Sequence, residues 1–289
     1  MAPGPASGDA GALANDRPVA VVTGATGGIG RWIALGMARA GHHVILIGRD
    51  RGRGRAALSW IDRQVPQAST ELLIADLSLL SETRNAARQI AARHARLSVL
   101  INNAGVFETR PIATAEGHDR VLATNLLSPF VLTQELLPVL LAGAPSRIVN
   151  VGSSTSDNAR IDPDNLVLGR RWTMRGAYSH SKLALMMTTF RLADRLKGTG
   201  VVANVVHPGL VATGLVRSGG VIGLVWRGLA FAALTEEQGA VTPLQAALAP
   251  EFAAASGLYL KDRRAAPPNP RALDQDLQER VWQATERLI

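Results

Sequence analysis

The chain has 289 residues, of which 47% are hydrophobic and 19% are charged, and it contains no cysteine. This composition excludes a disordered chain, and the missing cysteines exclude disulfides and thiolate chemistry. The net charge of +8 would suit a nucleic-acid partner. However, only three of the 31 basic residues are lysines, and the arginines are scattered rather than gathered in one stripe, so we expect no nucleic-acid binding.

Residues 1–16 are rich in proline, glycine, alanine and serine, and they lack the basic and apolar regions of a targeting signal. We expect them to form a disordered leader. The longest apolar stretch, residues 221–234, is interrupted by Arg227 and is too short to span a bilayer. We therefore expect a soluble, cytoplasmic protein with no transmembrane segment.

From Pro18 onward, short aliphatic and β-branched runs alternate with segments of helical periodicity. Helices are expected at residues 29–40, after Arg51, within residues 81–94 and from Tyr178 onward. Strands are expected at residues 19–22, 44–47, 72–75, 99–101, 147–151 and 201–206. Continuous apolar strands separated by helices predict a parallel sheet that is covered on both faces. The fold class is therefore α/β, a single-domain Rossmann fold over residues 17–289 with a doubly wound parallel sheet flanked by helices.

A glycine-rich turn, Thr23-Gly-Ala-Thr-Gly-Gly-Ile-Gly30, joins the first expected strand to the first expected helix. Glycines let the backbone approach a pyrophosphate, and the helix N-terminus offers it free N–H groups. This context predicts a dinucleotide site rather than an ordinary tight turn. The glycine spacing fits both G-x-x-x-G-x-G and G-x-x-G-x-x-G, so it leaves the subfamily open.

The end of the second strand bears on the choice between the two nicotinamide dinucleotides. An NAD site usually carries an acidic residue there for the ribose 2′-hydroxyl, whereas a 2′-phosphate favours arginine. The strand at residues 44–47 runs into Gly48 and Arg49, while Arg31 and Arg53 offer further cations for bidentate phosphate binding. Asp50 would face the ribose if the register shifted by one residue. We expect NADP(H) in preference to NAD(H).

The reacting groups are expected at Ser153, which follows a strand, and at Tyr178 and Lys182, which lie four residues apart on a helix and so share a face. A free tyrosine has a pKa of about 10, and a nearby ammonium lowers it. Tyr178 is then able to exchange a proton with an alcohol or carbonyl oxygen while hydride is transferred. A tyrosine and a lysine at this spacing are common on helix surfaces and do not by themselves indicate catalysis. The pair indicates a catalytic site here because it follows the glycine-rich turn and Ser153 in the chain.

These residues closely resemble the classical short-chain dehydrogenase/reductase superfamily over residues 18–215. The resemblance implies a catalytic set of Asn125, Ser153, Tyr178 and Lys182, in which Asn125 supports a proton relay to the lysine. It also implies cofactor contacts from both catalytic helix residues, Tyr178 and Lys182, and from Thr23, Gly24, Thr26, Gly28, Ile29, Gly30, Arg31, Arg49, Asp76, Leu77, Asn103, Ala104, Gly105, Pro208, Gly209, Val211 and Thr213. The Asn-Asn-Ala-Gly and Pro-Gly elements favour this type over the extended epimerase type.

A finer resemblance is to the retinol-dehydrogenase-like branch, carried by Arg147-Ile-Val-Asn-Val151, Tyr178-Ser-His-Ser-Lys-Leu-Ala184 and Val206-His-Pro-Gly209. Gly152 stands where the family often has serine, which favours Ser153 over Ser154 as the catalytic serine. The sequence shows no membrane anchor of the kind found in the retinoid enzymes. We therefore do not expect the substrate to be a retinoid on the strength of this resemblance.

Substrate choice is expected to depend on two loops, residues 154–176 and 214–236. The apolar part of the second loop, residues 221–234, is interpreted as a lid, an oligomer interface or a membrane-contacting helix. The polar insertion at residues 157–175 is a candidate gate of the cleft. His207 is expected to be structural, and no His, Asp and Glu have metal-ligand spacing, so no metal site is expected.

The sequence therefore predicts an NADP(H)-dependent oxidoreductase that interconverts a small hydrophobic alcohol and its ketone or aldehyde, as a monomer or a homo-oligomer. The alternative is a non-catalytic NADP(H)-sensing regulatory protein on the same fold. Such a sensor is expected to lose the tyrosine or the lysine, and this chain keeps both.

Overall fold

The computed structural model describes residues 17–210 and 234–289. The expected leader at residues 1–16 lies outside the described residues. So do Val211, Thr213 and all but the last three residues of the loop expected at 214–236.

Eight strands of the described chain form one sheet in the order β3-β2-β1-β4-β5-β6-β7-β8. All neighbouring strands are parallel except β7 and β8, which are antiparallel. The strands are β1 (Val19–Thr23), β2 (His43–Gly48), β3 (Thr70–Ile74), β4 (Val99–Asn102), β5 (Ser146–Val151), β6 (Val201–His207), β7 (Tyr259–Lys261) and β8 (Arg264–Ala265). From β1 the chain builds outward to β3, then returns to place β4 on the other side of β1. This reversal opens a crevice at the carboxyl ends of the two strands, where ligands bind in such sheets.

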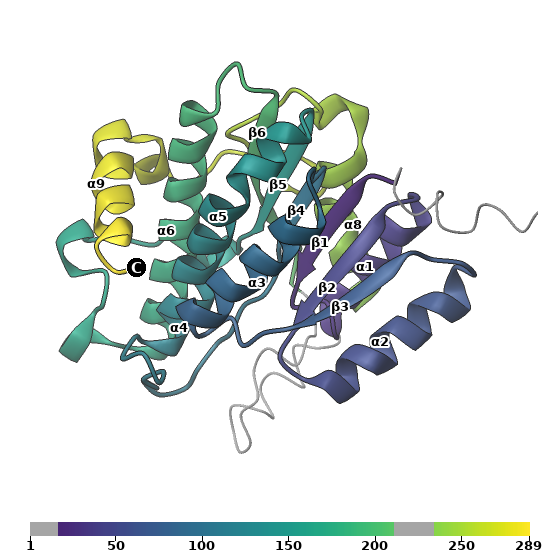
Figure 1. Ribbon diagram of the computed structural model, residues 1–289. Helices are drawn as coiled ribbons and strands as arrows, with labels where there is room; N and C mark the ends of the chain where they lie inside the picture. The colour runs from purple at the N-terminus through teal and green to yellow at the C-terminus, as the bar shows by residue number, and fades with distance from the viewer. Residues whose placement is uncertain (1–16, 211–233) are drawn as a thin grey trace, which may run out of the picture.

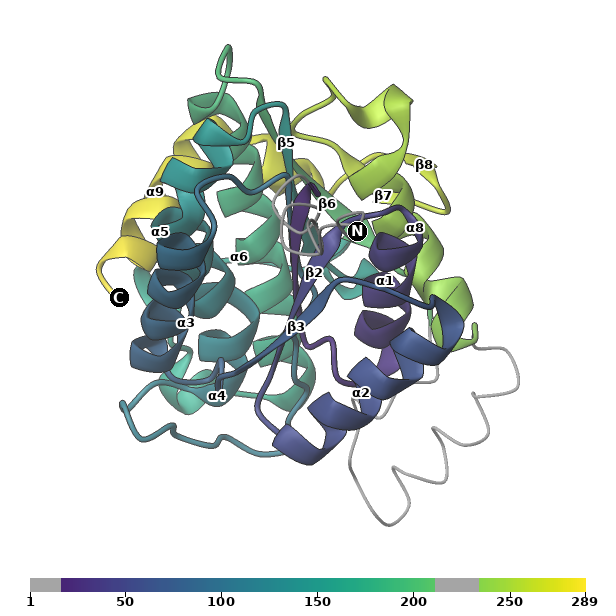
Figure 2. The same cartoon turned by 45° about the vertical axis from the view of Figure 1, so that its right-hand side comes forward.

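Helices cover both faces of the sheet (Figures 1 and 2). One layer contains α1 (Gly28–Arg39), α2 (Arg51–Gln64) and α8 (Glu236–Leu248). The other contains α3 (Leu80–Arg93), α4 (Arg120–Leu122), the π-helix η1 (Ala123–Leu127), α5 (Ser128–Ala142) and α6 (Met174–Arg195), with α9 (Gln275–Glu286) packed outside α6. The predicted doubly wound α/β fold is confirmed.

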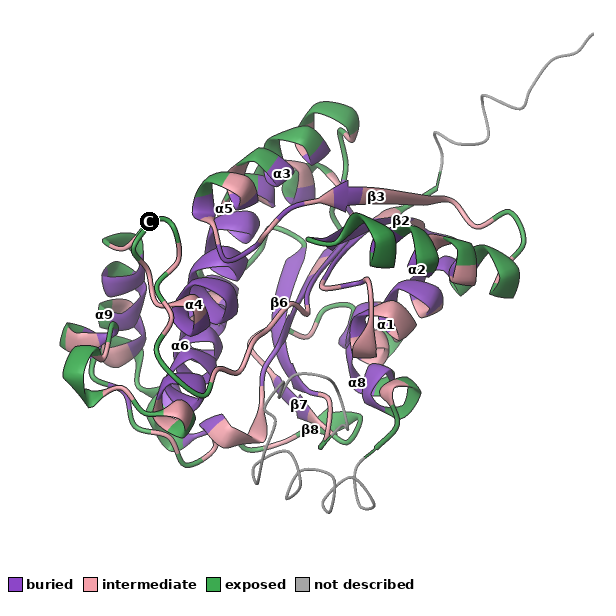
Figure 3. Ribbon diagram, turned by 90° about the horizontal axis from the view of Figure 1, so that it is seen from below, coloured by how far each residue is buried: buried purple, intermediate pink, exposed green. Residues whose placement is uncertain are grey.

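The core lies between the sheet and each helical layer, because the central strands are largely apolar and buried (Figure 3). Every residue of β4 and β6 is buried. The stretch Arg120–Ala142 is long and apolar enough to cross a bilayer, but 67% of its most apolar window is buried inside the fold. We therefore assign this stretch to the core of the protein.

The C-terminal segment fastens the polar insertion that follows β5. Asn269, which is buried, donates hydrogen bonds from Nδ2 to the Ser156 and Ala159 carbonyls at 2.8 and 2.9 Å. The Tyr259 hydroxyl donates to Asp157 Oδ1 at 3.0 Å. The insertion is thus held in short 3-10 turns, and its beginning is anchored to the body of the protein.

Replacing Asn269 tests this anchorage. Asn269→Ala leaves two carbonyls without their donor, so the free energy of unfolding in urea should fall by about 2 kcal/mol. Asn158→Ala, at an exposed position of the same insertion, should leave that free energy unchanged. Equal stability of the two variants would show that the insertion is not anchored in this way.

Candidate active site

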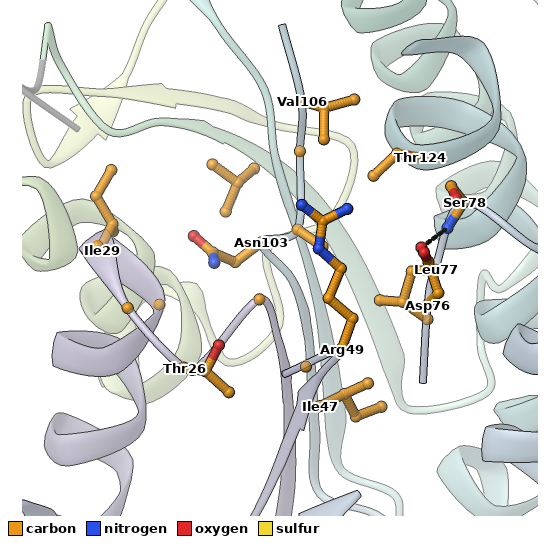
Figure 4. Close-up of a pocket in the computed structure, with 18 of the residues that line it drawn as sticks. Thr26, Ile29, Ile47, Arg49, Asp76, Leu77, Ser78, Asn103, Val106 and Thr124 are labelled. Carbon is orange, nitrogen blue, oxygen red and sulfur yellow. Dashed lines mark hydrogen bonds between the residues drawn. The ribbon is translucent and has the colours of Figure 1, made fainter. Parts of the chain in front are cut away.

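A cavity of about 350 Å³ opens at the carboxyl ends of β1, β2, β4 and β5, at the reversal of strand order. Its walls come from the glycine-rich turn and the ends of these strands (Figure 4), and from the start of α6. Most of the predicted site residues line it: Gly24, Thr26, Gly28, Ile29, Gly30, Arg49, Asp76, Leu77, Asn103, Ala104, Gly105, Tyr178, Lys182 and Pro208.

The glycine-rich turn has the geometry of a phosphate cradle. Gly24 and Gly28 have φ angles of +64° and +57°, which side chains rarely permit. A Cβ at Gly30 would lie 2.3 Å from the Gly24 carbonyl oxygen. The N-cap of α1, Gly27, makes no side-chain hydrogen bond, so the first N–H groups of α1 stay available to an anion. The turn therefore fits a dinucleotide pyrophosphate.

Thr23 does not line the cavity, but it holds in place the segment after β4 that does. Its Oγ1 accepts hydrogen bonds from the backbone N–H groups of Asn103 and Ala104, each at 2.9 Å. Asn103 Nδ2 donates in return to the Thr23 carbonyl at 2.9 Å. These hydrogen bonds connect the end of β1 to the segment that follows β4.

The arginines predicted to bind a 2′-phosphate separate into two groups. Arg49 extends from the end of β2 between Thr26 and the Asp76–Leu77 segment, and Arg53 also lines the cavity (Figure 4). Arg31 lies outside the lining residues. Its guanidinium stacks on Trp60, 4.4 Å from the ring centroid, and pairs with Glu236 at 3.7 Å, because the outer face of α1 offers it these partners instead.

Asp50, the alternative ribose ligand, is the N-cap of α2. Its Oδ1 accepts a hydrogen bond from the Arg53 N–H at 2.8 Å, and this bond holds the pKa of the carboxyl below its usual value. The carboxylate therefore has a structural role in the register that the chain adopts. At the adenine side, Asp76 accepts from the Ser78 N–H at 2.9 Å and lines the cavity with Leu77.

Tyr178 and Lys182 line the inner end of the cavity, and Ser153, which does not line it, lies beside Tyr178. Lys182 Nζ lies 5.9 Å from the centroid of the Tyr178 ring and donates a hydrogen bond to the Val151 carbonyl at 2.8 Å. The Ser153 side chain lies close enough to Tyr178 to lower its pKa, and its Oγ accepts hydrogen bonds from the Thr155 N–H and hydroxyl at 3.3 and 3.1 Å. Ser154 instead donates its backbone N–H to His207 Nδ1 at 3.2 Å, which gives His207 the structural role expected for it.

Burial sets the protonation of this pair. It raises the pKa of Tyr178 to about 12, which the Ser153 side chain opposes, and it lowers the pKa of Lys182 to about 8. The predicted lowering of the tyrosine pKa by the lysine is therefore wrong for the protein alone: the ammonium points to the Val151 carbonyl, and desolvation dominates. Tyr178 is consequently a protonated acid at neutral pH.

Asn125 is fully buried in the π-helix and is held on three sides. Its Oδ1 accepts from the Val106 N–H at 2.8 Å, while its Nδ2 donates to the Val106 carbonyl at 3.0 Å and to Ser181 Oγ at 3.1 Å. A Cβ on Gly105 would lie 3.4 Å from Asn125 Oδ1 and 3.5 Å from Lys182 Nζ. Asn125 thus adjoins the lysine, and its relay role stays a prediction.

The Pro-Gly element, Pro208-Gly209, directly follows β6. Pro208 lines the cavity, whereas Gly209 does not. Gly209 has a φ of +87°, and a Cβ there would lie 2.4 Å from Leu234, so this glycine permits a close turn beside the end of the undescribed segment. The predicted contacts of Val211 and Thr213 lie outside the described residues.

Sequence reasoning missed two residues of this site. The Phe107 ring, outside the cavity lining, packs edge-on against the Tyr178 ring with the centroids 5.1 Å apart and adds an apolar surface beside it. Thr124 Oγ1 is buried in the cavity wall without a hydrogen-bond partner among the described residues, which leaves it free for a ligand. Neither belongs to a spacing pattern. The position of Thr124 next to Asn125 was the one available signal.

Comparison with known proteins identifies the family. The profile of the short chain dehydrogenase family matches residues 18–219. The chain belongs to this family.

Two relatives and one solved structure place this short-chain dehydrogenase more finely. It is 37% identical to human retinol dehydrogenase 12, over 94% of this chain and 86% of the relative. It is 38% identical to mouse polyprenol dehydrogenase, over 93% and 83%. The structure of a short chain dehydrogenase from Burkholderia cenocepacia in complex with NADP matches with a TM-score of 0.68 and 25% identity, over 84% of this chain and 95% of that one.

These relatives confirm the predicted resemblance to retinol dehydrogenases and the assignment of the chain as an oxidoreductase. The alternative of a non-catalytic sensor finds no support among them. The cavity described above fits the nicotinamide cofactor that this fold binds.

The cradle is testable by adding single methyl groups. Gly30→Ala drives Cβ into the Gly24 carbonyl and should lower the free energy of unfolding by about 1–3 kcal/mol, because backbone has to move. Gly27→Ala is the matched control, since its Cβ would meet nothing within 4 Å. Urea unfolding of both variants without ligand measures the difference, and equal stabilities would refute the close approach.

Proposed function

We propose that this short-chain dehydrogenase uses NADP(H) to interconvert a hydrophobic alcohol and its ketone or aldehyde, with Tyr178 as general acid and base. The observation that carries the proposal is that buried Tyr178 and Lys182 line the inner end of the dinucleotide cavity, with Ser153 next to Tyr178. A protonated phenol beside a serine hydroxyl is suited to binding and protonating a carbonyl oxygen.

In the reducing direction, the Ser153 and Tyr178 hydroxyls donate hydrogen bonds to the substrate carbonyl oxygen and polarise it. The bound dinucleotide supplies the hydride that the carbonyl carbon accepts. Tyr178 then transfers its hydroxyl proton to the oxygen, which becomes the alcohol. Lys182, one helical turn away, stabilises the phenolate that remains, and it is expected to hydrogen-bond the nicotinamide ribose. In the oxidising direction Tyr178 removes the alcohol proton.

The preference for NADP(H) rests on Arg49 and Arg53. Both line the end of the cavity where β2 finishes, and the Asp50 carboxylate is occupied as the N-cap of α2. Two guanidinium groups favour a 2′-phosphate over a 2′-hydroxyl. The complex of the Burkholderia cenocepacia relative with NADP supports the same choice.

The proposal of an apolar substrate rests on two observations. Phe107 packs against the reacting tyrosine, and the relatives are named for apolar alcohols. Retinol and polyprenol, which the relatives' names give as substrates, are both apolar alcohols. An edge-on aromatic ring at this point favours an apolar group next to the reacting carbon.

Removing one hydroxyl tests the mechanism. Tyr178→Phe should lower the turnover number with NADPH and an apolar aldehyde or ketone at least ~100-fold, because the proton donor is lost. The affinity for NADPH, measured by calorimetry, should change little. Tyr259→Phe removes the hydroxyl of the only other tyrosine in the sequence, which lies away from the cavity lining, and should keep turnover within a few-fold. Unchanged turnover in Tyr178→Phe would overturn the mechanism.

Removing one guanidinium tests the cofactor choice. Arg49→Ala should weaken NADPH binding by about tenfold, because a charge-assisted contact to phosphate is lost, while NADH binding should hardly change. Arg51→Ala, an exposed arginine of α2 outside the cavity lining, is the matched control. The wild-type protein should bind NADPH more tightly than NADH; equal affinities would remove the role of Arg49.

A further inference from the structure

Two histidines and a glutamate meet at the end of the sheet opposite the dinucleotide cavity. His43 is the first residue of β2, Glu71 is the second residue of the edge strand β3, and His94 is the C-cap of α3. The register pairs Ile45 with Glu71, so Glu71 and His43 project from the same face of the sheet, the face that α3 covers. Three separate elements thus deliver one side chain each to one point.

The facing atoms are close but make no hydrogen bonds. His43 Nε2 lies 3.8 Å from Glu71 Oε2, and His94 Nε2 lies 3.6 Å from the same oxygen, both beyond hydrogen-bond distance. One ligand atom from each residue lies within 4.8 Å of the other two. Both Nε2 atoms are buried and have no hydrogen-bond partner among the described residues. Buried nitrogens are rarely left in this condition without a ligand.

Neighbouring groups orient the three side chains from behind. His43 Nδ1 lies 2.7 Å from Ser69 Oγ, and a proton on Nδ1 would leave the lone pair of Nε2 directed at the cluster. Arg93 pairs with Glu71 Oε1 and leaves Oε2 facing the rings. Metal-binding histidines and carboxylates are commonly held by such outer contacts.

We propose that His43, Glu71 and His94 bind a divalent transition-metal ion, with Zn²⁺ as the ion this set of two imidazoles and one carboxylate best fits. Zn²⁺ lies about 2.0–2.2 Å from such ligands, which places tetrahedral donor atoms about 3.4 Å from one another. The two histidine–glutamate separations of 3.8 and 3.6 Å exceed this by a few tenths of an ångström, and no pair of ligand atoms is more than 4.8 Å apart, so the side chains must move inward to bind the ion. The side chains are 17–22% exposed, so water can complete the coordination.

The ion would join the edge strand β3 to β2 and to the end of α3. It would stabilise the half of the sheet that carries Arg49 and Asp76 at its other end, without touching the cavity. Arg93, which pairs with Glu71, and Arg17, whose charge lowers the pKa of His43, are both positive. Their charges repel a cation and limit the affinity of the site for a metal ion. The sequence predicted no metal site, because it shows no metal-ligand spacing. The three ligands come from separate elements, and only the fold brings them together.

The test uses the full chain, without an affinity tag and freed of metal with a chelator. Titration with ZnCl₂ in a calorimeter should give one ion per chain, and the melting temperature should rise with Zn²⁺ and return on adding chelator. Co²⁺ should give the visible absorption of a tetrahedral complex, and Zn²⁺ should abolish it.

Variants assign the binding to these residues. His43→Gln, His94→Gln and Glu71→Gln should each weaken Zn²⁺ binding at least ~10-fold, a loss typical of even an outer contact at metal sites. His118→Gln, which removes a histidine outside the cluster, should bind Zn²⁺ as the wild type does. Circular dichroism and NADPH binding show whether each variant is folded.

Absence of Zn²⁺ binding by the wild-type chain would overturn the proposal. So would folded His43→Gln and His94→Gln variants that keep the wild-type affinity. Because the cluster and the cavity share no residue, a failure of this proposal would leave the proposed oxidoreductase function untouched, and loss of turnover in Tyr178→Phe would say nothing about the metal.

Discussion

The hydrogen bond from Lys182 Nζ to the Val151 carbonyl joins the catalytic helix to the end of β5. A buried ammonium is costly unless it is hydrogen-bonded, so this contact is what allows a lysine to lie 3% exposed beside a cavity. It fixes the distance between α6 and the sheet at the point where Tyr178 enters the site. The same burial raises the pKa of Tyr178 to about 12 and lowers that of Lys182 to about 8. The protonation of the site is therefore a consequence of how tightly α6 packs on the sheet.

The rest of the site follows from the parallel sheet. All strands that reach the cavity end at the same edge, so short segments after β1, β2, β4 and β5 converge there. The Thr23 contacts to Asn103 and Ala104 join the ends of β1 and β4 at the base of the crevice. Asn125, in turn, fixes the Val106 backbone against α6 through Ser181. Each contact ties a loop to a rigid element, which is how a fold holds reacting groups in position.

Most of the fold was predictable from the sequence, because buried parallel strands are continuous apolar runs such as Val44–Ile47. The glycine-rich turn also marked where the first strand ends and the first helix begins. The strands β7 and β8 were missed, since they are short and lack such runs. The site residues with a spacing pattern, such as Tyr178 and Lys182, were placed correctly at the cavity. Arg31 was not, because the sequence does not reveal that Trp60 and Glu236 compete for its guanidinium. The tyrosine pKa was wrong because desolvation depends on packing, and the cluster of His43, Glu71 and His94 depends on the fold alone.

The most direct test of the account is the pH dependence of kcat/KM for NADPH, which reports ionisations of the unliganded enzyme. Lys182 is charged below its folded-state pKa and loses its proton as the pH rises through about 8, whereas Tyr178 keeps its proton to about 12. The account predicts a fall in kcat/KM centred near pH 8, reflecting loss of the ammonium. A value of kcat/KM that stays constant well above pH 8 would contradict the claim that burial of Lys182 beside Tyr178 controls catalysis.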